Sequence, residues 1–127
     1  MSASNTVDMI RSEAEHVGSV PFLLTVTDDG RPHSVAAGIA WHADTLEVSA
    51  GKRSLANVGS RRFVSVLWPA AQAGEYSLIV DGEAAVTGSG ADARVVVTPT
   101  RAVLHRQATS ADTMRPGCGA DCRPLFG

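Results

Sequence analysis

The spacing of apolar residues near the N-terminus predicts a helix. Four apolar side chains recur every three or four positions, which places them on one side of a helix. Asn5 or Thr6 can cap such a helix, and Gly18 can end it. We therefore expect a helix over residues 5–17. Its apolar side consists of Val7, Ile10, Ala14 and Val17.

After Gly18 the pattern changes to a period of two, which is typical of strands. Six such runs, several of them rich in β-branched side chains, predict six strands. Asp29-Gly30 favours a two-residue hairpin turn between the first two strands. Gly82 and Pro99 predict a bulge or an edge position inside the last two. The strands cover residues 20–27, 33–41, 45–50, 62–68, 76–88 and 93–106, with a short helix over 52–59.

Six strands joined as an antiparallel meander would expose two edges if the sheet stayed open. Closure into a small barrel removes those edges, so we expect a mainly β barrel over residues 19–106 with short flanking helices. The segment 108–127 is polar and rich in glycine and proline, which predicts a loosely ordered tail or one that lies on a partner. The length of 127 residues suits a single domain.

The second predicted strand has one face with almost no side-chain bulk. Ser34, Ala36, Gly38 and Ala40 share that face, and larger side chains such as Val35 alternate with them. Such a face lets a flat ligand lie close to the backbone, but tight packing against a helix produces the same pattern. The sequence alone leaves both interpretations open.

Composition narrows the class of protein. Apolar residues make up 44% of the chain and charged residues 19%, as in ordinary globular proteins. The net charge of −2 does not suggest a nucleic-acid-binding protein. No apolar run approaches the roughly 20 residues that span a bilayer, and the N-terminus lacks the features of a signal peptide. We therefore expect a cytoplasmic protein without a membrane partner.

Candidate chemistry lies where the third strand meets the short helix. The only lysine of the chain, Lys52, stands beside Arg53, and Ser49, Ser54 and Asn57 add neutral hydrogen-bonding groups. The start of a helix presents unpaired backbone N–H groups, which favour an anion such as phosphate. An exposed basic helix start without a function is the alternative interpretation.

Four sequence elements together resemble the pyridoxamine 5′-phosphate oxidase-like family of split β-barrel flavoproteins. They are TDDGRPH at 27–33, the basic corner with Asn57, VSVLWP at 64–69 and VDGEA at 80–84. The resemblance covers about residues 18–106. It implies a six-stranded antiparallel split β-barrel that forms a homodimer. It also implies a cofactor at the subunit interface, usually FMN and in some branches a deazaflavin coenzyme.

The resemblance also implies which residues hold the cofactor. An ungapped match puts the arginine and lysine of the family's phosphate corner on Arg53 and Ser54, with Lys52 one position earlier. Pro32 and Ala37 stand where the family carries basic residues, and His33 is the nearest substitute. The cofactor-binding residues expected on this basis are His33, Ser34, Val35, Ser49, Lys52, Arg53, Ser54, Asn57, Trp68 and Ser77.

The sequence does not indicate catalytic groups of the protein's own, so any redox chemistry belongs to the cofactor ring. His105 and Arg106 could stand in for the family's substrate-binding pair, but a solvated strand end explains them better, and vitamin B6 oxidation is not expected. Cys118 and Cys122 supply too few sulfurs for a zinc site. We expect a local disulfide or two free thiols there, and no metal.

The sequence thus predicts an FMN-dependent oxidoreductase that acts on an unidentified small-molecule substrate. Two alternatives remain: a deazaflavin-dependent reductase of the same fold, and a non-catalytic protein that binds flavin or haem.

Overall fold

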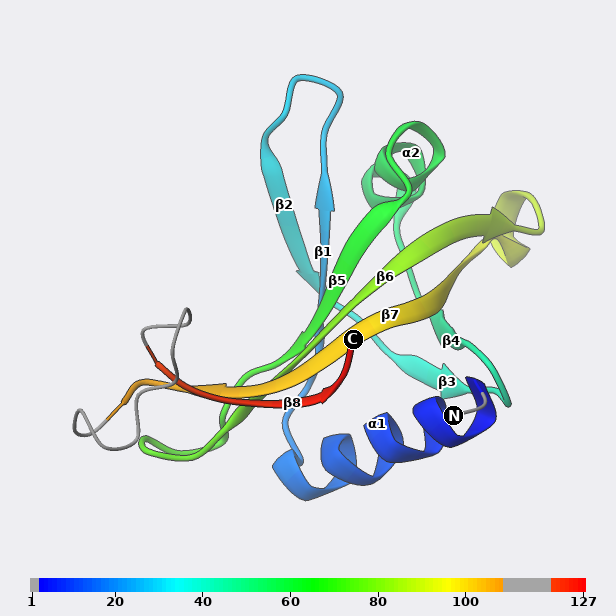
Figure 1. Ribbon diagram of the computed structural model, residues 1–127. Helices are drawn as coiled ribbons and strands as arrows, with labels where there is room; N and C mark the ends of the chain where they lie inside the picture. The colour runs from blue at the N-terminus through cyan, green and yellow to red at the C-terminus, as the bar shows by residue number, and fades with distance from the viewer. Residues whose placement is uncertain (1–2, 109–119) are drawn as a thin grey trace.

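A curled antiparallel sheet with a helix at each end forms the described part of the chain (Figure 1). The structure is a computed structural model and describes residues 3–108 and 120–127. The helices are α1 (Ala3–Val17) and α2 (Lys52–Ser60), with a short 3-10 turn η1 (Gly90–Asp92). The strands are β1 (Phe22–Val26), β2 (Pro32–Ala36), β3 (Ile39–Trp41), β4 (Leu46–Val48), β5 (Phe63–Trp68), β6 (Ser77–Thr87), β7 (Arg94–Arg106) and β8 (Asp121–Phe126).

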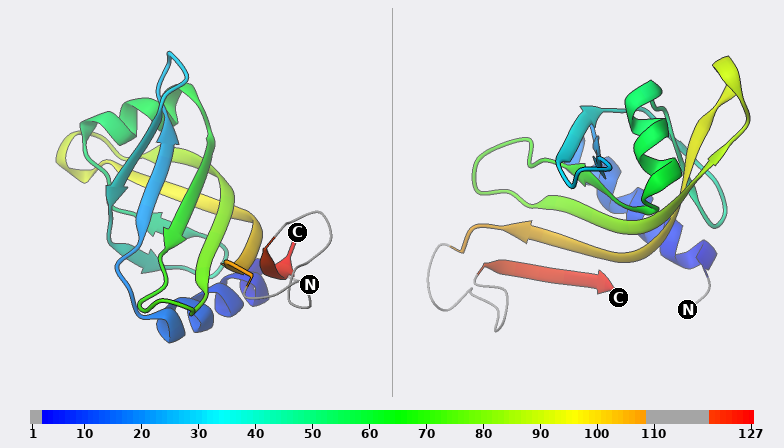
Figure 2. Two further views of the ribbon diagram at one scale, coloured as in Figure 1. Left: turned by 90° about the vertical axis from the view of Figure 1, so that its left-hand side faces the viewer. Right: turned by 90° about the horizontal axis from the view of Figure 1, so that it is seen from above.

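The order of the strands explains why the sheet curls. Neighbours run β2-β1-β5-β6-β7-β4-β3, so its two outer strands are consecutive in the chain. The two residues between β2 and β3 therefore join opposite edges of one sheet and close it at that point. Figure 2 shows the resulting half-barrel from two further sides. The prediction of a mainly β, antiparallel split barrel is confirmed.

The described residues form eight strands, whereas the sequence predicts six. The predicted second strand breaks between Ala37 and Gly38 because its hydrogen-bond partner changes there. The Ala37 N–H donates to Pro21 O, just before β1, at 3.0 Å, whereas Gly38 O accepts from the N–H of Ser49, just after β4, at 3.0 Å. The other additional strand is β8, which lies along β7.

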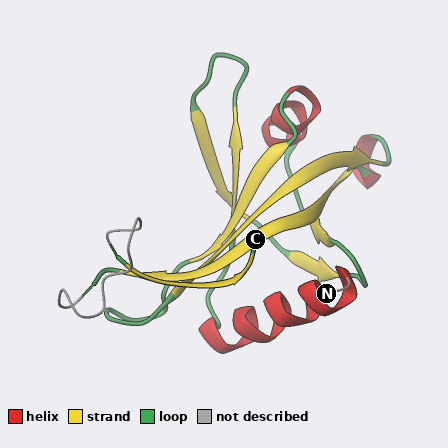
Figure 3. Ribbon diagram, in the orientation of Figure 1, coloured by secondary structure: helices red, strands yellow, loops and turns green. Residues whose placement is uncertain are grey.

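The two helices cover opposite ends of the half-barrel, and Figure 3 shows how little helix the fold contains. The predicted apolar side of α1 is confirmed, because Val7, Ile10 and Ala14 are buried and join the core. The helix begins at Ala3, so the prediction that Asn5 or Thr6 caps it is wrong. Among the described residues, no helix is long and apolar enough to cross a membrane.

The C-terminal strand corrects the prediction of an irregular tail over its last residues. Asp121 is buried and accepts hydrogen bonds from Tyr76 at 2.8 Å and Arg106 at 2.7 Å, which ties β8 to the loop between β5 and β6 and to β7. The Tyr76 hydroxyl and then the Arg106 guanidinium hold the pKa of Asp121 below its usual value. Cys122 is disulfide-bonded. The chain's other cysteine, Cys118, lies outside the described residues.

A bulge bends the two longest strands, as Gly82 and Pro99 predict. The pairing of β6 with β7 shifts register between Asp81 and Gly82, and Gly82 lies opposite Pro99. A Cβ on Gly82 would come within 2.6 Å of Thr98 O and of Val97 Cγ1. Close approach of the β7 backbone therefore requires glycine at this position.

We expect Gly82→Ala to lower the free energy of unfolding by about 1–3 kcal/mol, because the added methyl overlaps β7. Urea denaturation followed by circular dichroism measures this change. Gly59→Ala in α2 is the matched control, since a Cβ there meets nothing within 4 Å. That variant should be as stable as the original chain or slightly more stable. Equal stability of both variants would contradict the role assigned to Gly82.

Candidate functional site

A cleft of 540 Å³ opens between β2 and the start of α2. It contains six of the ten residues that the sequence analysis assigns to cofactor binding: His33, Val35, Ser49, Lys52, Arg53 and Ser54. Ala36, Ala50 and Gly51 complete its lining. The barrel's closure brings these segments together, because β2 and the β4–α2 connection meet where the two edges of the sheet join.

The first turn of α2 presents hydrogen-bond donors to the cleft. Gly51 is the residue before the helix and makes no side-chain capping bond. The first bond of the helix runs from Leu55 N–H to Gly51 O at 3.0 Å. The N–H groups of Lys52, Arg53 and Ser54 consequently have no acceptor within the helix, and the positive end of the helix dipole lies at the same point. This geometry favours an anion.

Lys52 and Arg53 differ from the other cations of the chain. Both are exposed, and neither forms an ion pair or a side-chain hydrogen bond with any described residue. Every other arginine in the described ranges contacts a carboxylate, a backbone carbonyl or an aromatic ring. These are Arg11, Arg31, Arg61, Arg62, Arg94, Arg101, Arg106 and Arg123. The uncompensated positive charge therefore lies at the cleft.

Two serines extend the set of hydrogen-bonding groups. Ser54 is only 2% exposed, yet it lines the cleft and has no hydrogen-bond partner among the described residues. No buried side-chain N or O atom of the described residues lacks a partner, so the Ser54 oxygen is open to the cleft, where a ligand or water can bind it. The Ser49 oxygen accepts from the Gly38 N–H at 2.7 Å. The Ser49 proton therefore remains available to an acceptor in the cleft.

The other four predicted residues lie outside the cleft lining. Asn57 is buried behind it, with its amide nitrogen 3.0 Å from Thr25 Oγ1. Trp68 is 3% exposed and stacks on Trp41, with ring centroids 5.8 Å apart. Ser77 is the first residue of β6, and its side-chain oxygen accepts a hydrogen bond from Ala70 N–H. Ser34 lies on the exposed face of β2.

Among the described residues, the face of β2 with little side-chain bulk is not packed against a helix, which was one of the two interpretations that the sequence left open. No helix of the described chain covers Ser34, Ala36, Gly38 or Ala40, since all four are exposed. The register places Ala36 opposite Phe22 and Ser34 opposite Leu24 on the neighbouring strand β1. The face with little side-chain bulk is therefore continuous with an apolar outer stripe. We define this outer stripe as Phe22, Leu24, Val26, Phe63 and Leu67 of β1 and β5.

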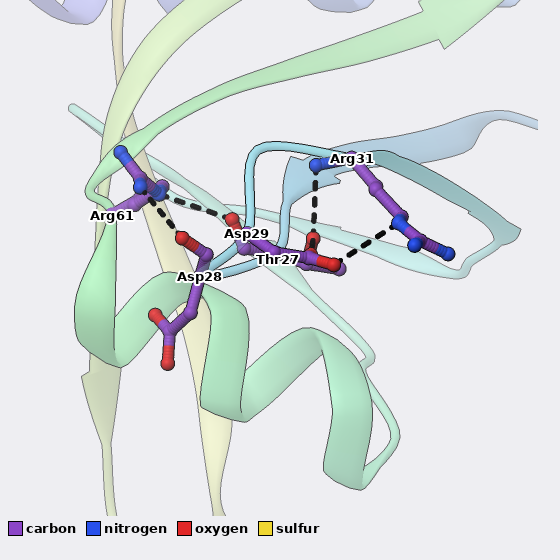
Figure 4. Close-up of polar contacts among 5 residues, drawn as sticks. All are labelled: Thr27, Asp28, Asp29, Arg31 and Arg61. Atoms are coloured by element: carbon purple, nitrogen blue, oxygen red, sulfur yellow. Dashed lines mark hydrogen bonds and ion pairs between the residues drawn. The ribbon is translucent and has the colours of Figure 1, made fainter.

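The loop between β1 and β2 is fastened to the end of α2. Figure 4 shows Arg61 donating to two loop carbonyls, Thr27 O at 3.1 Å and Asp28 O at 2.9 Å. The Gly30 N–H donates to Thr27 O, and Gly30 has a positive φ of 85°. The predicted hairpin is present, but its loop has three residues rather than two. A glycine in the left-handed region after an ordinary turn is typical of such loops.

Thr25 and Arg61 are structural neighbours of the site that the sequence analysis missed. Thr25 is a polar residue at an inward position of β1, between the buried Leu23 and the outward Val26, and that position is the signal that could have indicated it. Arg61 carries no comparable signal, because its role depends on a loop distant in the sequence.

Two mycobacterial proteins are related to this chain in sequence. An uncharacterized protein of Mycobacterium bovis and one of Mycobacterium tuberculosis are each 37% identical over 115 residues, which covers 80% of this chain and 81% of theirs. The chain belongs to the family of these two proteins. No family model matches it.

Solved structures of other proteins identify the fold of this chain. A candidate pyridoxamine 5′-phosphate oxidase from Listeria innocua has a TM-score of 0.62 at 20% identity, over 78% of this chain and 97% of that one. HupZ of group A Streptococcus has a TM-score of 0.63 at 11% identity, over 74% and 91%. An F420 reductase has a TM-score of 0.53 at 22% identity, over 66% and 88%. The fold is that of the pyridoxamine 5′-phosphate oxidase-like proteins, as the resemblance predicts.

We expect Arg61→Ala to destabilise the chain by about 1 kcal/mol, because the hairpin loses two charge-assisted bonds to α2. Arg11→Ala is the matched control, since Arg11 makes only an exposed ion pair with Glu15 on α1. Its loss should cost less than about 0.5 kcal/mol. Urea denaturation of both variants measures the difference. In hydrogen exchange, the hairpin amides should lose protection in Arg61→Ala alone, and equal protection in both would contradict the fastening role.

Proposed function

We propose that the chain is an FMN-dependent oxidoreductase in which the cleft holds the FMN phosphate. The observation that carries this proposal is the pair of uncompensated cations, Lys52 and Arg53, at an uncapped helix start beside the unpartnered Ser54 hydroxyl. A phosphate dianion supplies acceptors for these donors. Charge-assisted bonds of this kind contribute about 1.5–3 kcal/mol each, so three of them support micromolar affinity once ring burial is added.

The exposed face of β2 is the proposed contact surface for the flavin ring. Ala36 lines the cleft and also belongs to the face with little side-chain bulk, so the phosphate position and the ring position are adjacent. A bound flavin supplies the redox chemistry, and the protein orients it and excludes water. The substrate is a small molecule that approaches the ring.

The second wall of the ring site is proposed to come from another copy of the chain. Phe63 of the outer stripe is 63% exposed, and Phe22 is exposed as well. A groove of 350 Å³ on the same face is lined by apolar residues that include Leu24, Val26 and Phe63, together with the polar residues Thr25, Ser65, Asp81 and Thr100. Apolar surface of this kind is typical of a protein interface. A homodimer formed through the outer stripe would cover it and enclose the neighbouring face of β2.

A deazaflavin coenzyme is the second candidate ligand. One of the structures with this fold is an F420 reductase, at 22% identity. The cleft offers just two cationic side chains, Lys52 and Arg53, so its charge does not favour FMN strongly over another phosphorylated flavin analogue. On this alternative the protein is a deazaflavin-dependent reductase that uses the same cleft.

The first test is a titration of the purified full chain with FMN and, separately, with F420, followed by absorbance and fluorescence. We expect FMN to bind and Arg53→Ala to weaken that binding about 10- to 150-fold. Arg11→Ala, which removes an arginine of α1 outside the cleft, should bind FMN as the original chain does.

The outcomes of this titration separate the candidates. Binding of F420 without FMN would replace the first candidate by the second. Unchanged FMN affinity in Arg53→Ala would contradict the phosphate position. Bound flavin that dithionite reduces but neither NADH nor NADPH reduces would favour a flavin-binding protein without NAD(P)H-dependent oxidoreductase activity. No binding of either coenzyme would contradict the proposal.

The second test concerns the interface. We expect the chain to elute as a dimer in size-exclusion chromatography with light scattering, and Phe63→Glu to shift it toward monomer because a buried carboxylate would lack a partner. Ser12→Glu on the exposed side of α1 is the control and should leave the dimer intact. A monomeric original chain, or a Phe63→Glu variant that stays dimeric, would contradict an interface at the outer stripe.

A further inference from the structure

Three polar side chains form a chain of contacts from the interior to the cleft. Asn57 of α2 donates from Nδ2 to Thr25 Oγ1 at 3.0 Å, and Thr25 Oγ1 contacts His33 Nδ1 at 3.5 Å. Thr25 is 2% exposed and Asn57 is 7% exposed, whereas His33 lines the cleft. The register of the sheet explains the second contact, because Thr25 and His33 lie directly opposite each other on β1 and β2.

The burial of Thr25 determines where its proton goes. Its oxygen accepts from Asn57, so its own O–H requires an acceptor, because an unsatisfied buried hydroxyl is costly. His33 Nδ1 is the remaining side-chain atom in contact with Thr25 Oγ1. The direction of this contact depends on the tautomer of His33: Thr25 O–H donates to Nδ1 when the ring hydrogen is on Nε2, and Nδ1–H donates to Thr25 Oγ1 in the other tautomer. The need of the Thr25 proton for an acceptor favours the hydrogen on Nε2.

We propose that Thr25 and Asn57 are positioning residues that hold His33 as the neutral Nε2–H tautomer. His33 thereby becomes a hydrogen-bond donor to the bound cofactor. This inference rests on the proposed function, because it assigns a specificity role within the same cleft. The role belongs to Thr25 and Asn57 through His33, since neither of them lines the cleft.

The fixed tautomer makes the polar groups of the cleft alike. Lys52, Arg53 and the free N–H groups of α2 can only donate. The Ser49 oxygen already accepts from Gly38, so its proton is the group that it offers. With His33 also donating, the cleft favours acceptor atoms, such as the oxygens of a fully ionised phosphate or a ring carbonyl. Ser54 is the one polar side chain of the lining whose hydroxyl can equally accept. A ligand group that carries its own donor hydrogen finds few acceptors there.

The first experiment measures the tautomer directly, in the full chain without cofactor. Long-range ¹⁵N–¹H correlation spectra at about pH 8, above the ordinary histidine pKa of about 6.5, distinguish a protonated ring nitrogen from an unprotonated one. We expect His33 to carry its hydrogen on Nε2, with His33→Ala identifying the signal. A hydrogen on Nδ1 would overturn the proposal. The measurement is independent of FMN, so it stands even where the proposed function fails.

The second experiment tests the coupling between the positioning residues and His33. Thr25→Val removes the hydroxyl and should mix the two tautomers, whereas Thr25→Ser retains the hydroxyl and should preserve the original spectrum. We expect Thr25→Val to weaken FMN binding about 3- to 10-fold and Thr25→Ser to leave it unchanged within twofold.

A double-mutant cycle separates positioning from a general structural effect. In a His33→Ala background, Thr25→Val should weaken FMN binding no further, because the residue through which it acts is absent. Equal losses in both backgrounds would overturn the positioning role. Inorganic phosphate is the second probe and should shift the His33 Nε2–H signal in the original chain. A phosphate shift without FMN binding would count against the proposed function alone, and no shift with either probe would overturn the donor role of His33.

Discussion

The pair of hydrogen bonds between Gly38 and Ser49 is the contact on which the rest of the structure depends. Gly38 O accepts from the Ser49 N–H, and the Gly38 N–H donates to Ser49 Oγ. These bonds take the chain from the β1 side of the sheet to the β4 side within two residues. The same bonds hold residues 49–54 beside β2, so the contact that closes the barrel also forms the cleft.

The periodic parts of the fold could be predicted from the sequence, and the parts set by distant contacts could not. Val7, Ile10 and Ala14 face the core because helical spacing fixes which side they share. The break at Gly38 was missed because burial keeps alternating through Ala37, so the pattern continues while the partner strand changes. β8 was missed because its sequence, DCRPLF, has no alternation of apolar and polar residues and contains a proline, which disfavours a strand. Contacts of Asp121 with side chains distant in the sequence stabilise it.

Some residues of the candidate site could likewise be predicted from the sequence, and others could not. Lys52, Arg53 and Ser54 could be found because the local sequence specifies a strand end followed by a helix start. Trp68 could not be placed, because its stacking on Trp41 depends on how strands distant in sequence meet. His33 was found as a substitute base, but its chemistry depends on Thr25 and Asn57, which sequence reasoning could not connect to it. The charged residues of the site could thus be predicted from the local sequence. Its hydrogen bonds could not, because they join residues that only the folded sheet brings together.

The two halves of β7 have different neighbouring strands, and β8 covers the edge of the second half. Residues 95–97 pair with β4, whereas residues 102–106 pair with β8 on the side away from β6. Without β8, the backbone groups of that second half would form an open edge, and an open edge is a template for strands of other molecules. By pairing with this half of β7, residues 121–126 cover an edge that could otherwise pair with a strand of another molecule.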